Sequence, residues 1–250
     1  GLSDAELKPE TYVFGPGNFV PSGTYDRGLE KMNYEQLLRQ LAPDLAKQKY
    51  FPTRDVAGAD LLIMVHWGAS QIYEDPQRDQ AMDALKSALP AYQAAVQETG
   101  MADPGEMNAI SDTLAWGRDN SQMAMARNAA LLGYARSLHR WGADNGYQSE
   151  RAKMLRSELA EERYFVVLMA YDNHLLRREK KKKLLWVTRL SVRTPGNNFG
   201  EALPVLSQAG SHVFGRQTED LVHVKANLRE GRVDIGELKV VGTDVAAPKP

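Results

Sequence analysis

The chain contains no cysteine in 250 residues. Disulfides, thiolate zinc sites and cysteine nucleophiles are therefore excluded within this sequence. A composition without cysteine does not fix the compartment, but it fits a bacterial envelope protein that avoids stray oxidation. The sequence begins Gly1-Leu2 rather than with methionine. A signal peptide or a lipid-anchoring segment could therefore have been removed upstream, which would suit an extracytoplasmic protein, periplasmic or at the outer envelope.

An excess of one charge is also missing. Lys and Arg total 31 against 32 Asp and Glu, for a formal net charge of −1. Because duplex binding needs a dominant basic surface, we expect no nucleic-acid partner. No apolar stretch approaches the roughly 18–20 residues of a spanning helix, so we expect no transmembrane segment. The apolar share of 43% and charged share of 25% are ordinary for a folded globular chain.

Common enzyme signatures are absent as well. The chain has no G-x-S-x-G elbow, no H-E-x-x-H, no phosphate-binding G-x-x-x-x-G-K-S/T and no G-x-G-x-x-G. Gly210-Ser211-His212 places a serine beside a histidine, but neighbouring side chains on a helix point about 100° apart, which is wrong for a dyad. We therefore expect no catalytic residue, no metal and no cofactor, and the balance favours a protein that is not an enzyme.

What the chain does have is two apolar runs, Ala59–Gly68 and Arg163–Asp172. Both are apolar on the two alternating faces of a strand, which predicts strands buried on both sides in the middle of a covered sheet. A helical pattern fills the sequence between them. The fold class we predict is α+β, with a mixed or antiparallel sheet covered by helices and an inserted all-helical block. The sheet domain would comprise residues 1–71 plus 163–250, and the insertion 72–162.

Several further elements follow from local signals. Thr11–Phe14 predicts a short strand, and the glycines and prolines of 15–23 predict loop. Asn33 and Gln36 have capping-box spacing at the start of a helix that Pro43 should kink or split. The block 75–162 predicts four helices, one of them with the 3-to-4 spacing of Met82, Leu85, Leu89, Tyr92 and Val96.

The last third of the chain predicts more sheet. Leu184–Arg193 alternates apolar and polar residues, as a strand with one dry and one wet face does. Asn198 and Glu201 begin a helix, and the segments 222–227 and 233–241 predict a hairpin.

If the two buried strands are antiparallel neighbours, the insertion joins them at one end of the sheet. A junction of this kind is a usual place for a pocket, and we predict ligand-binding residues there. They are His66, Trp67, Tyr73, Arg163 and Tyr164. His66 could be a ligand or general base tuned near neutral pH. The simpler interpretation is a histidine bonded to the backbone with Trp67 packed beneath the helices, and a lone histidine favours it.

Two further motifs follow the second strand. Asp172-Asn173-His174 could orient a base or hold a metal, but a turn begun by Asx side-chain bonds is the more common use of such residues. After it come six basic residues interrupted only by Glu179. This run predicts either a contact with anionic lipid or phosphate, or a solvated turn whose charges discourage edge pairing. The six are Arg177, Arg178, Lys180, Lys181, Lys182 and Lys183.

Methionines and tryptophans gather in the helical block, at Met101, Met107, Met123, Met125, Trp116 and Trp141. They could line an adaptable apolar pocket. Core packing of a helical subdomain is the interpretation that their spacing favours.

Three segments carry a resemblance. Leu45–Tyr50 ends a helix before Ala59-Asp60-Leu61-Leu62, a later strand opens with Lys183–Trp186, and a closing helix covers Phe199–Arg216. This order resembles small uncharacterised bacterial envelope lipoprotein domains, in which a strand reads Ala-Asp-hydrophobic and a later strand carries a tryptophan near its start. The resemblance covers pieces of the sheet portion and not the helical block. It implies an extracytoplasmic location and an interaction or assembly role.

The sequence leaves two functions open. The first is a non-enzymatic envelope protein that binds a protein partner or the membrane surface. The second is a small-molecule binding protein or unfamiliar hydrolase that uses His66, Tyr73 and Arg163 at the junction of sheet and insertion. The first is the one we favour.

Overall fold

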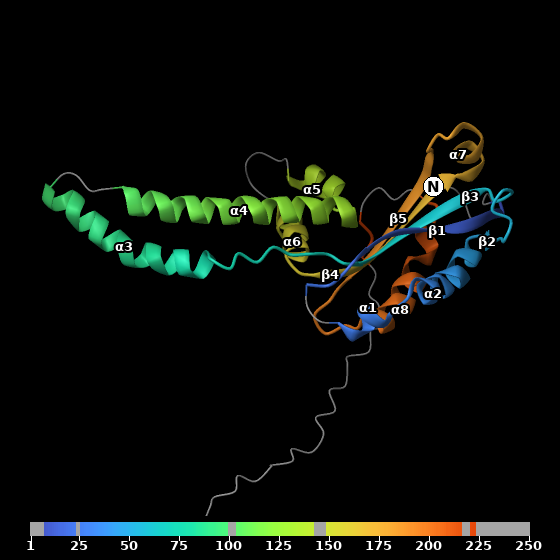
Figure 1. The fold of residues 1–250 in the computed structure, drawn as a ribbon, viewed down its shortest axis with the longest axis horizontal. Coiled ribbons are helices and arrows are strands. Elements are labelled where there is room, and N and C mark those ends of the chain that lie inside the picture. Colours follow the sequence, from blue (N-terminus) through green and yellow to red (C-terminus); the bar gives the residue numbers. More distant parts are fainter. Residues whose placement is uncertain (1–7, 24–25, 100–103, 143–148, 217–220, 224–250) are drawn as a thin grey trace, which may run out of the picture.

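The computed structural model describes residues 8–23, 26–99, 104–142, 149–216 and 221–223. Five strands form one mixed sheet in the order β2-β1-β3-β4-β5. β1, β2 and β3 are parallel, and β4 runs antiparallel to both β3 and β5. Helices cover both faces, so the α+β prediction is confirmed (Figure 1). The strands are β1 (Glu10–Val20), β2 (Tyr50–Pro52), β3 (Leu61–Ala69), β4 (Arg163–Asp172) and β5 (Leu184–Arg193).

The two apolar runs are the neighbouring strands β3 and β4, paired from Leu61–Asp172 to Ala69–Tyr164. β4 is buried on both faces over most of its length, as predicted. In β3 only one face is fully buried over the first six residues, and the prediction of two buried faces was wrong there. The helices on the second face pack against β4 and β5, so they leave that face of β3 half-covered.

β1 is longer than the sequence predicted. It continues through Gly15-Pro16-Gly17 to Val20, where we expected a loop. β2 pairs only with residues 10–12, so Pro16 lies where β1 is an edge strand and needs no backbone donor on that side. Gly17 passes so close to β3 that an added Cβ would lie 2.5 Å from the Val65 carbonyl oxygen. The register shifts between Pro16 and Phe19, which marks a bulge.

Three helices cover the first face of the sheet: α1 (Arg27–Lys31), α2 (Tyr34–Lys47) and α8 (Phe199–Gly210), followed by the 3-10 turn η2 (Ser211–Val213). The predicted capping box of Asn33 and Gln36 begins α2. Pro43 does not split this helix, because it lies inside a single helix that runs to Lys47. Leucines of α2 and Phe199 of α8 are fully buried against the odd-numbered residues of β3.

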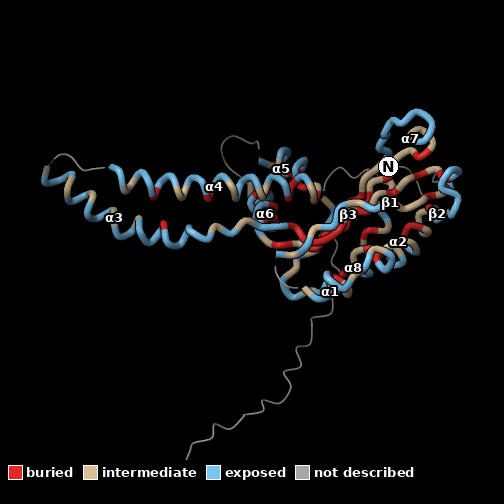
Figure 2. Tube along the Cα trace, in the orientation of Figure 1, coloured by how far each residue is buried: buried red, intermediate tan, exposed pale blue. Residues whose placement is uncertain are grey.

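The insertion contains the four predicted helices: α3 (Arg78–Thr99), α4 (Gly105–Leu132), α5 (Ala135–Gly142) and α6 (Glu150–Leu159). α6 and the end of α4 pack on the second face of the sheet, over Phe165 and Val167. α3 and most of α4 form a long helical hairpin that extends away from the sheet; we call these two helices the arm (Figure 1). Most of the arm is exposed (Figure 2).

The connection between β4 and β5 contains a short helix, α7 (Asn173–Glu179). The sequence predicted a basic turn over residues 177–183, and the first three of these residues are helical instead. Asp172 accepts a hydrogen bond from the Leu175 N–H and begins this helix, which explains the difference. The hairpin predicted at 222–227 and 233–241 lies almost wholly outside the described residues.

Candidate functional site

The structure divides the predicted junction residues between the two faces of the sheet. Trp67 and Tyr164 belong to the core beneath α8, where both rings contact Phe199. His66 is paired with Val167, which faces the insertion, and Arg163 contacts Tyr134 on that same side. Alternation along a strand separates consecutive side chains in this way. The five residues therefore do not converge on one site.

His66 has a backbone partner. Its Nδ1 accepts a hydrogen bond from the Asn18 N–H at 3.0 Å, so that lone pair is occupied. Burial lowers the pKa of His66 below its ordinary value of 6.5, because it disfavours the charged form of the ring. Both observations describe a histidine that fixes the bulged part of β1 against β3.

Two more of the five predicted residues, Tyr164 and Arg163, also have structural partners. The Tyr164 hydroxyl donates to Asp26 Oδ2 at 2.5 Å, and burial together with this carboxylate raises the pKa of Tyr164. The Arg163 Nε donates to the Ser191 hydroxyl at 3.3 Å, and its Nη1 lies 4.0 Å from Glu158 Oε2. The same Glu158 oxygen accepts from the Tyr134 hydroxyl at 2.6 Å. These contacts tie α6 to the sheet.

Two cavities border the region. The larger, about 440 Å³, lies between the second half of β1, α1 and the start of α2. Phe19, Met32 and Trp67 contribute to its wall. The smaller, about 190 Å³, lies where the insertion leaves the sheet and includes Tyr73 and Met123. The Tyr73 hydroxyl is buried there and has no hydrogen-bond partner among the described residues.

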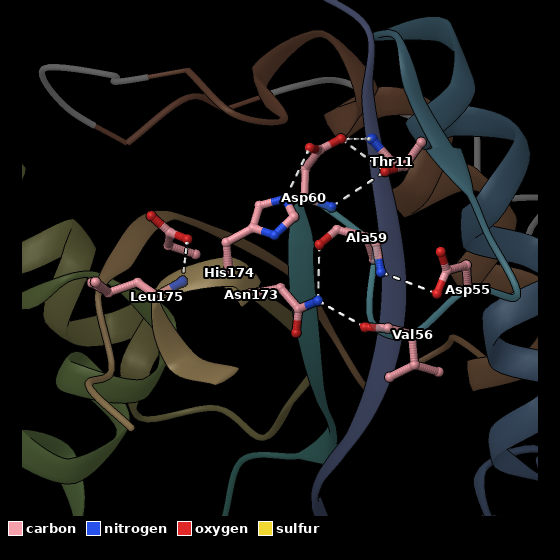
Figure 3. A network of polar contacts seen from close by, with 10 residues as sticks. Thr11, Asp55, Val56, Ala59, Asp60, Asn173, His174 and Leu175 are labelled. Carbon is pink, nitrogen blue, oxygen red and sulfur yellow. Dashed lines mark hydrogen bonds and ion pairs between the residues drawn. The ribbon is translucent and has the colours of Figure 1, made fainter. Parts of the chain in front are cut away.

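Asp172-Asn173-His174 forms the base of α7 (Figure 3). Asn173 Nδ2 donates to the carbonyl oxygens of Val56, at 2.9 Å, and Ala59, at 2.8 Å. Asp60 accepts from the backbone and the hydroxyl of Thr11, and these bonds lower the pKa of its carboxyl group. The predicted turn was wrong, because Asp172 caps the helix α7 and the Asn173 side chain bonds a loop that is distant in the sequence. Among the described residues, no group of three or more His, Asp or Glu is placed to hold a metal.

The arm presents the chain's least expected surface. Its inner seam consists largely of small residues on α3, Ala81, Ala88 and Ala95, together with Leu85 and Tyr92. The larger side chains Met82, Leu89 and Val96, every seventh residue of the same helix, lie on the outside and are 38–40% exposed. Of the predicted apolar stripe, therefore, only Leu85 and Tyr92 pack in the seam with α4.

α4 has exposed apolar residues as well. Trp116 is 61% and Met123 60% exposed, so the interpretation as core was wrong for these two residues, whereas Met125 packs against the core on the second face of the sheet. Met101 lies outside the described residues. Spacing alone could not distinguish the seam from the outside, because both positions repeat every seven residues.

The segment between β3 and α3 holds the arm in place. Asn128 Nδ2 donates to the Gln71 carbonyl oxygen at 2.9 Å. The Tyr73 ring meets Trp116 edge-on, with centroids 6.3 Å apart. Gly117 lies so close to Asp75 that a Cβ there would come 1.9 Å from the carboxylate. These three contacts fix the base half of α4 relative to the sheet.

No protein-family model matches the chain, and no curated protein matches it. In the described ranges, no helix combines the length and apolar character needed to cross a membrane.

Proposed function

We propose that this protein is a non-enzymatic assembly protein of the bacterial envelope, and that the arm joins two copies of the chain. The observation that carries this proposal is the outward stripe of α3, Met82, Leu89 and Val96. A helix in a two-stranded coiled coil needs apolar residues only at its two seam positions, whereas a helix in a larger bundle has a third apolar position beside them. α3 has the pattern of the larger bundle.

A second copy is the occupant that best fits the stripe. Symmetric dimers use one patch twice and are the commonest oligomers of soluble proteins. The helix carries both signs of charge, Arg78 and Lys86 against Asp79, Asp83 and Glu98, so two copies would meet with little net repulsion. Two hairpins laid antiparallel would form a four-helix bundle.

The size of the arm also suits a dimer. The 22 residues of α3 extend about 33 Å, and two adjacent helices are about 20 Å wide. A hairpin face of this size would cover about 1,300 Å² over both copies, which lies within the range of specific interfaces. Burying the three stripe residues in each copy would contribute about 5 kcal/mol.

Sedimentation equilibrium of the intact chain tests the proposal. We expect a dimer with a dissociation constant of about 1 μM or tighter. Replacing the stripe by Met82→Gln, Leu89→Gln and Val96→Gln should weaken the dimer at least about a hundredfold. The matched control is Ala84→Gln, Ala91→Gln and Ala94→Gln, three exposed alanines on the same helix, which should remain dimeric.

Two outcomes would contradict this function. One is a wild-type chain that stays monomeric at about 100 μM. The other is equal loss of the dimer in both triple variants, with circular dichroism showing that the helices persist.

The envelope location is supported by the absence of cysteine in all 250 residues and by the resemblance of the sheet portion to envelope lipoprotein domains. Fractionation of cells that express the full-length gene tests it, with a periplasmic marker and a cytoplasmic marker as references. We expect the protein with the envelope fractions, and recovery with the cytoplasmic marker would contradict the location without affecting the dimer.

The second candidate is a small-molecule binding protein, favoured by the cavity of about 440 Å³ beside β1. Its volume lies in the range of ligand sites, and the rings of Phe19 and Trp67 meet in its wall with centroids 4.5 Å apart and planes tilted by 45°. An anilinonaphthalene sulfonate probe should bind there and should lose affinity in Phe19→Ala. Equal binding by wild type and variant would remove this candidate.

A further inference from the structure

The connection between β4 and β5 is longer than the geometry of a hairpin requires. Antiparallel neighbours can be joined by two to five residues, whereas residues 173–183 intervene here. The Asp172 N–H donates to the Lys183 carbonyl oxygen at 3.0 Å, which closes the base of the connection. α7 therefore projects beyond the end of the sheet, at the opposite end of the molecule from the arm (Figure 1).

The projection is fixed to the sheet. Asn173, which is buried, holds the Val56–Ala59 loop through its side-chain amide, and its N–H donates to the Asp60 carbonyl oxygen at 3.0 Å (Figure 3). His174 Nε2 lies 3.5 Å from Asp60 Oδ1. An ordered projection costs conformational entropy that a short turn would avoid. The interpretation of the basic run as a solvated turn therefore does not explain why this segment forms an ordered projection.

Basic and apolar side chains share this projection. We define the basic tip as Arg177, Arg178, Lys180, Lys181, Lys182 and Lys183, all exposed. Glu179 pairs with Lys181 at 2.9 Å, and no other ion pair involves the basic tip within the described part of the chain. Leu184 and Leu185 follow directly and are 46% and 42% exposed, and Val56, on the loop held by Asn173, is 52% exposed.

We propose that the basic tip docks the protein on the surface of an anionic lipid membrane. Clustered Lys and Arg are attracted to anionic headgroups, and adjacent apolar side chains enter the boundary between headgroups and acyl chains. A free phosphate ion would use the cations but would leave the exposed leucine pair without a role. A nucleic acid would meet a chain whose formal net charge is −1. The combination of charge and exposed leucines therefore favours lipid.

Vesicle co-sedimentation tests this surface independently of the arm. The probes are phosphatidylcholine vesicles with and without about 30% phosphatidylglycerol, at about 0.05 M salt. Wild type should bind only the anionic vesicles. Lys180→Gln, Lys182→Gln and Lys183→Gln together should weaken binding about a hundredfold. The control, Lys31→Gln, Arg39→Gln and Lys153→Gln, removes the same charge from exposed positions outside the basic tip and the arm and should bind within about threefold of wild type.

A second variant isolates the apolar part. Leu184→Ser with Leu185→Ser should keep binding at low salt and lose it at about 0.3 M salt, where screening removes most of the charge attraction. The proposal would be overturned by wild type that does not bind anionic vesicles, by equal loss in the tip variant and its charge-matched control, or by displacement from vesicles by inorganic phosphate at unchanged ionic strength. The last result would assign the tip to a free phosphate instead.

Discussion

Asn173 offers the sharpest test of how the end of the sheet is built. Its side chain is 3% exposed and donates to two carbonyl oxygens, of Val56 and Ala59. Asn173→Ala removes both hydrogen bonds and leaves the two carbonyl oxygens without this donor. The bond to Ala59 is fully buried and the bond to Val56 is partly buried. A buried polar group without a partner costs about 1–3 kcal/mol, so we expect a loss of about 2–3 kcal/mol in the free energy of unfolding.

Equilibrium unfolding in urea at about 25 °C measures this loss, provided that the slope of the transition is unchanged. The matched control is Asn197→Ala, which removes one amide hydrogen bond, 2.8 Å long, to the Arg193 carbonyl oxygen at an exposed site. We expect the control to lose less than about 0.5 kcal/mol. Equal losses in the two variants would refute the assignment of Asn173 as the clamp of α7.

Three further changes probe other parts of the fold. Gly68→Ala should prevent stable folding, because Gly68 has φ +139° and an added Cβ would lie 1.9 Å from a carbonyl oxygen of β1. The control is Gly142→Ala, where an added Cβ would meet open space, and it should leave the melting temperature within about 2 °C of wild type. His66→Asn should flatten the pH dependence of stability. The unfolded chain takes up a proton near pH 6.5 before folded His66 does, so stability falls as pH drops through 6.5, and wild type should lose more than the variant between about pH 7.5 and 5.5. Tyr164→Phe leaves Asp26 without its hydroxyl partner and should cost about 1–2 kcal/mol in urea unfolding; a loss under about 0.5 kcal/mol would contradict that role.

The sequence predicted what local chemistry decides. β4 and β5 have the predicted bounds, because long apolar or alternating runs are sufficient to define a strand. The capping boundary of α2 at Asn33 was also predictable, since both halves of a capping box are visible in sequence.

The features that the sequence did not predict depend on contacts between residues that are far apart in the chain. β1 continues through Gly15-Pro16-Gly17, where β3 lies too close to Gly17 to admit a side chain. This close approach depends on the tertiary fold, so no local sequence signal predicts it. Consecutive side chains of a strand point to opposite faces of the sheet. His66 and Trp67 are neighbours in the sequence and therefore lie on opposite faces.

The face of α3 that packs inward in the arm could not be predicted without the position of α4. The stripe of α3 satisfies a helical repeat equally well whether Met82 and Leu89 face α4 or solvent. Only the packing of the alanine seam shows that the larger side chains lie outside.

Spin-label distances within the dimer test the central claim most directly. Because the chain has no cysteine, Ala94→Cys provides a single label site on the exposed surface of α3, away from the stripe. Antiparallel pairing of two arms predicts an intermolecular distance of about 20–25 Å between the labels. A label introduced by Arg39→Cys, on α2, should give a clearly longer distance. Absence of any intermolecular distance in the Ala94→Cys variant, or a shorter distance from the α2 label than from the arm label, would contradict assembly through the arm.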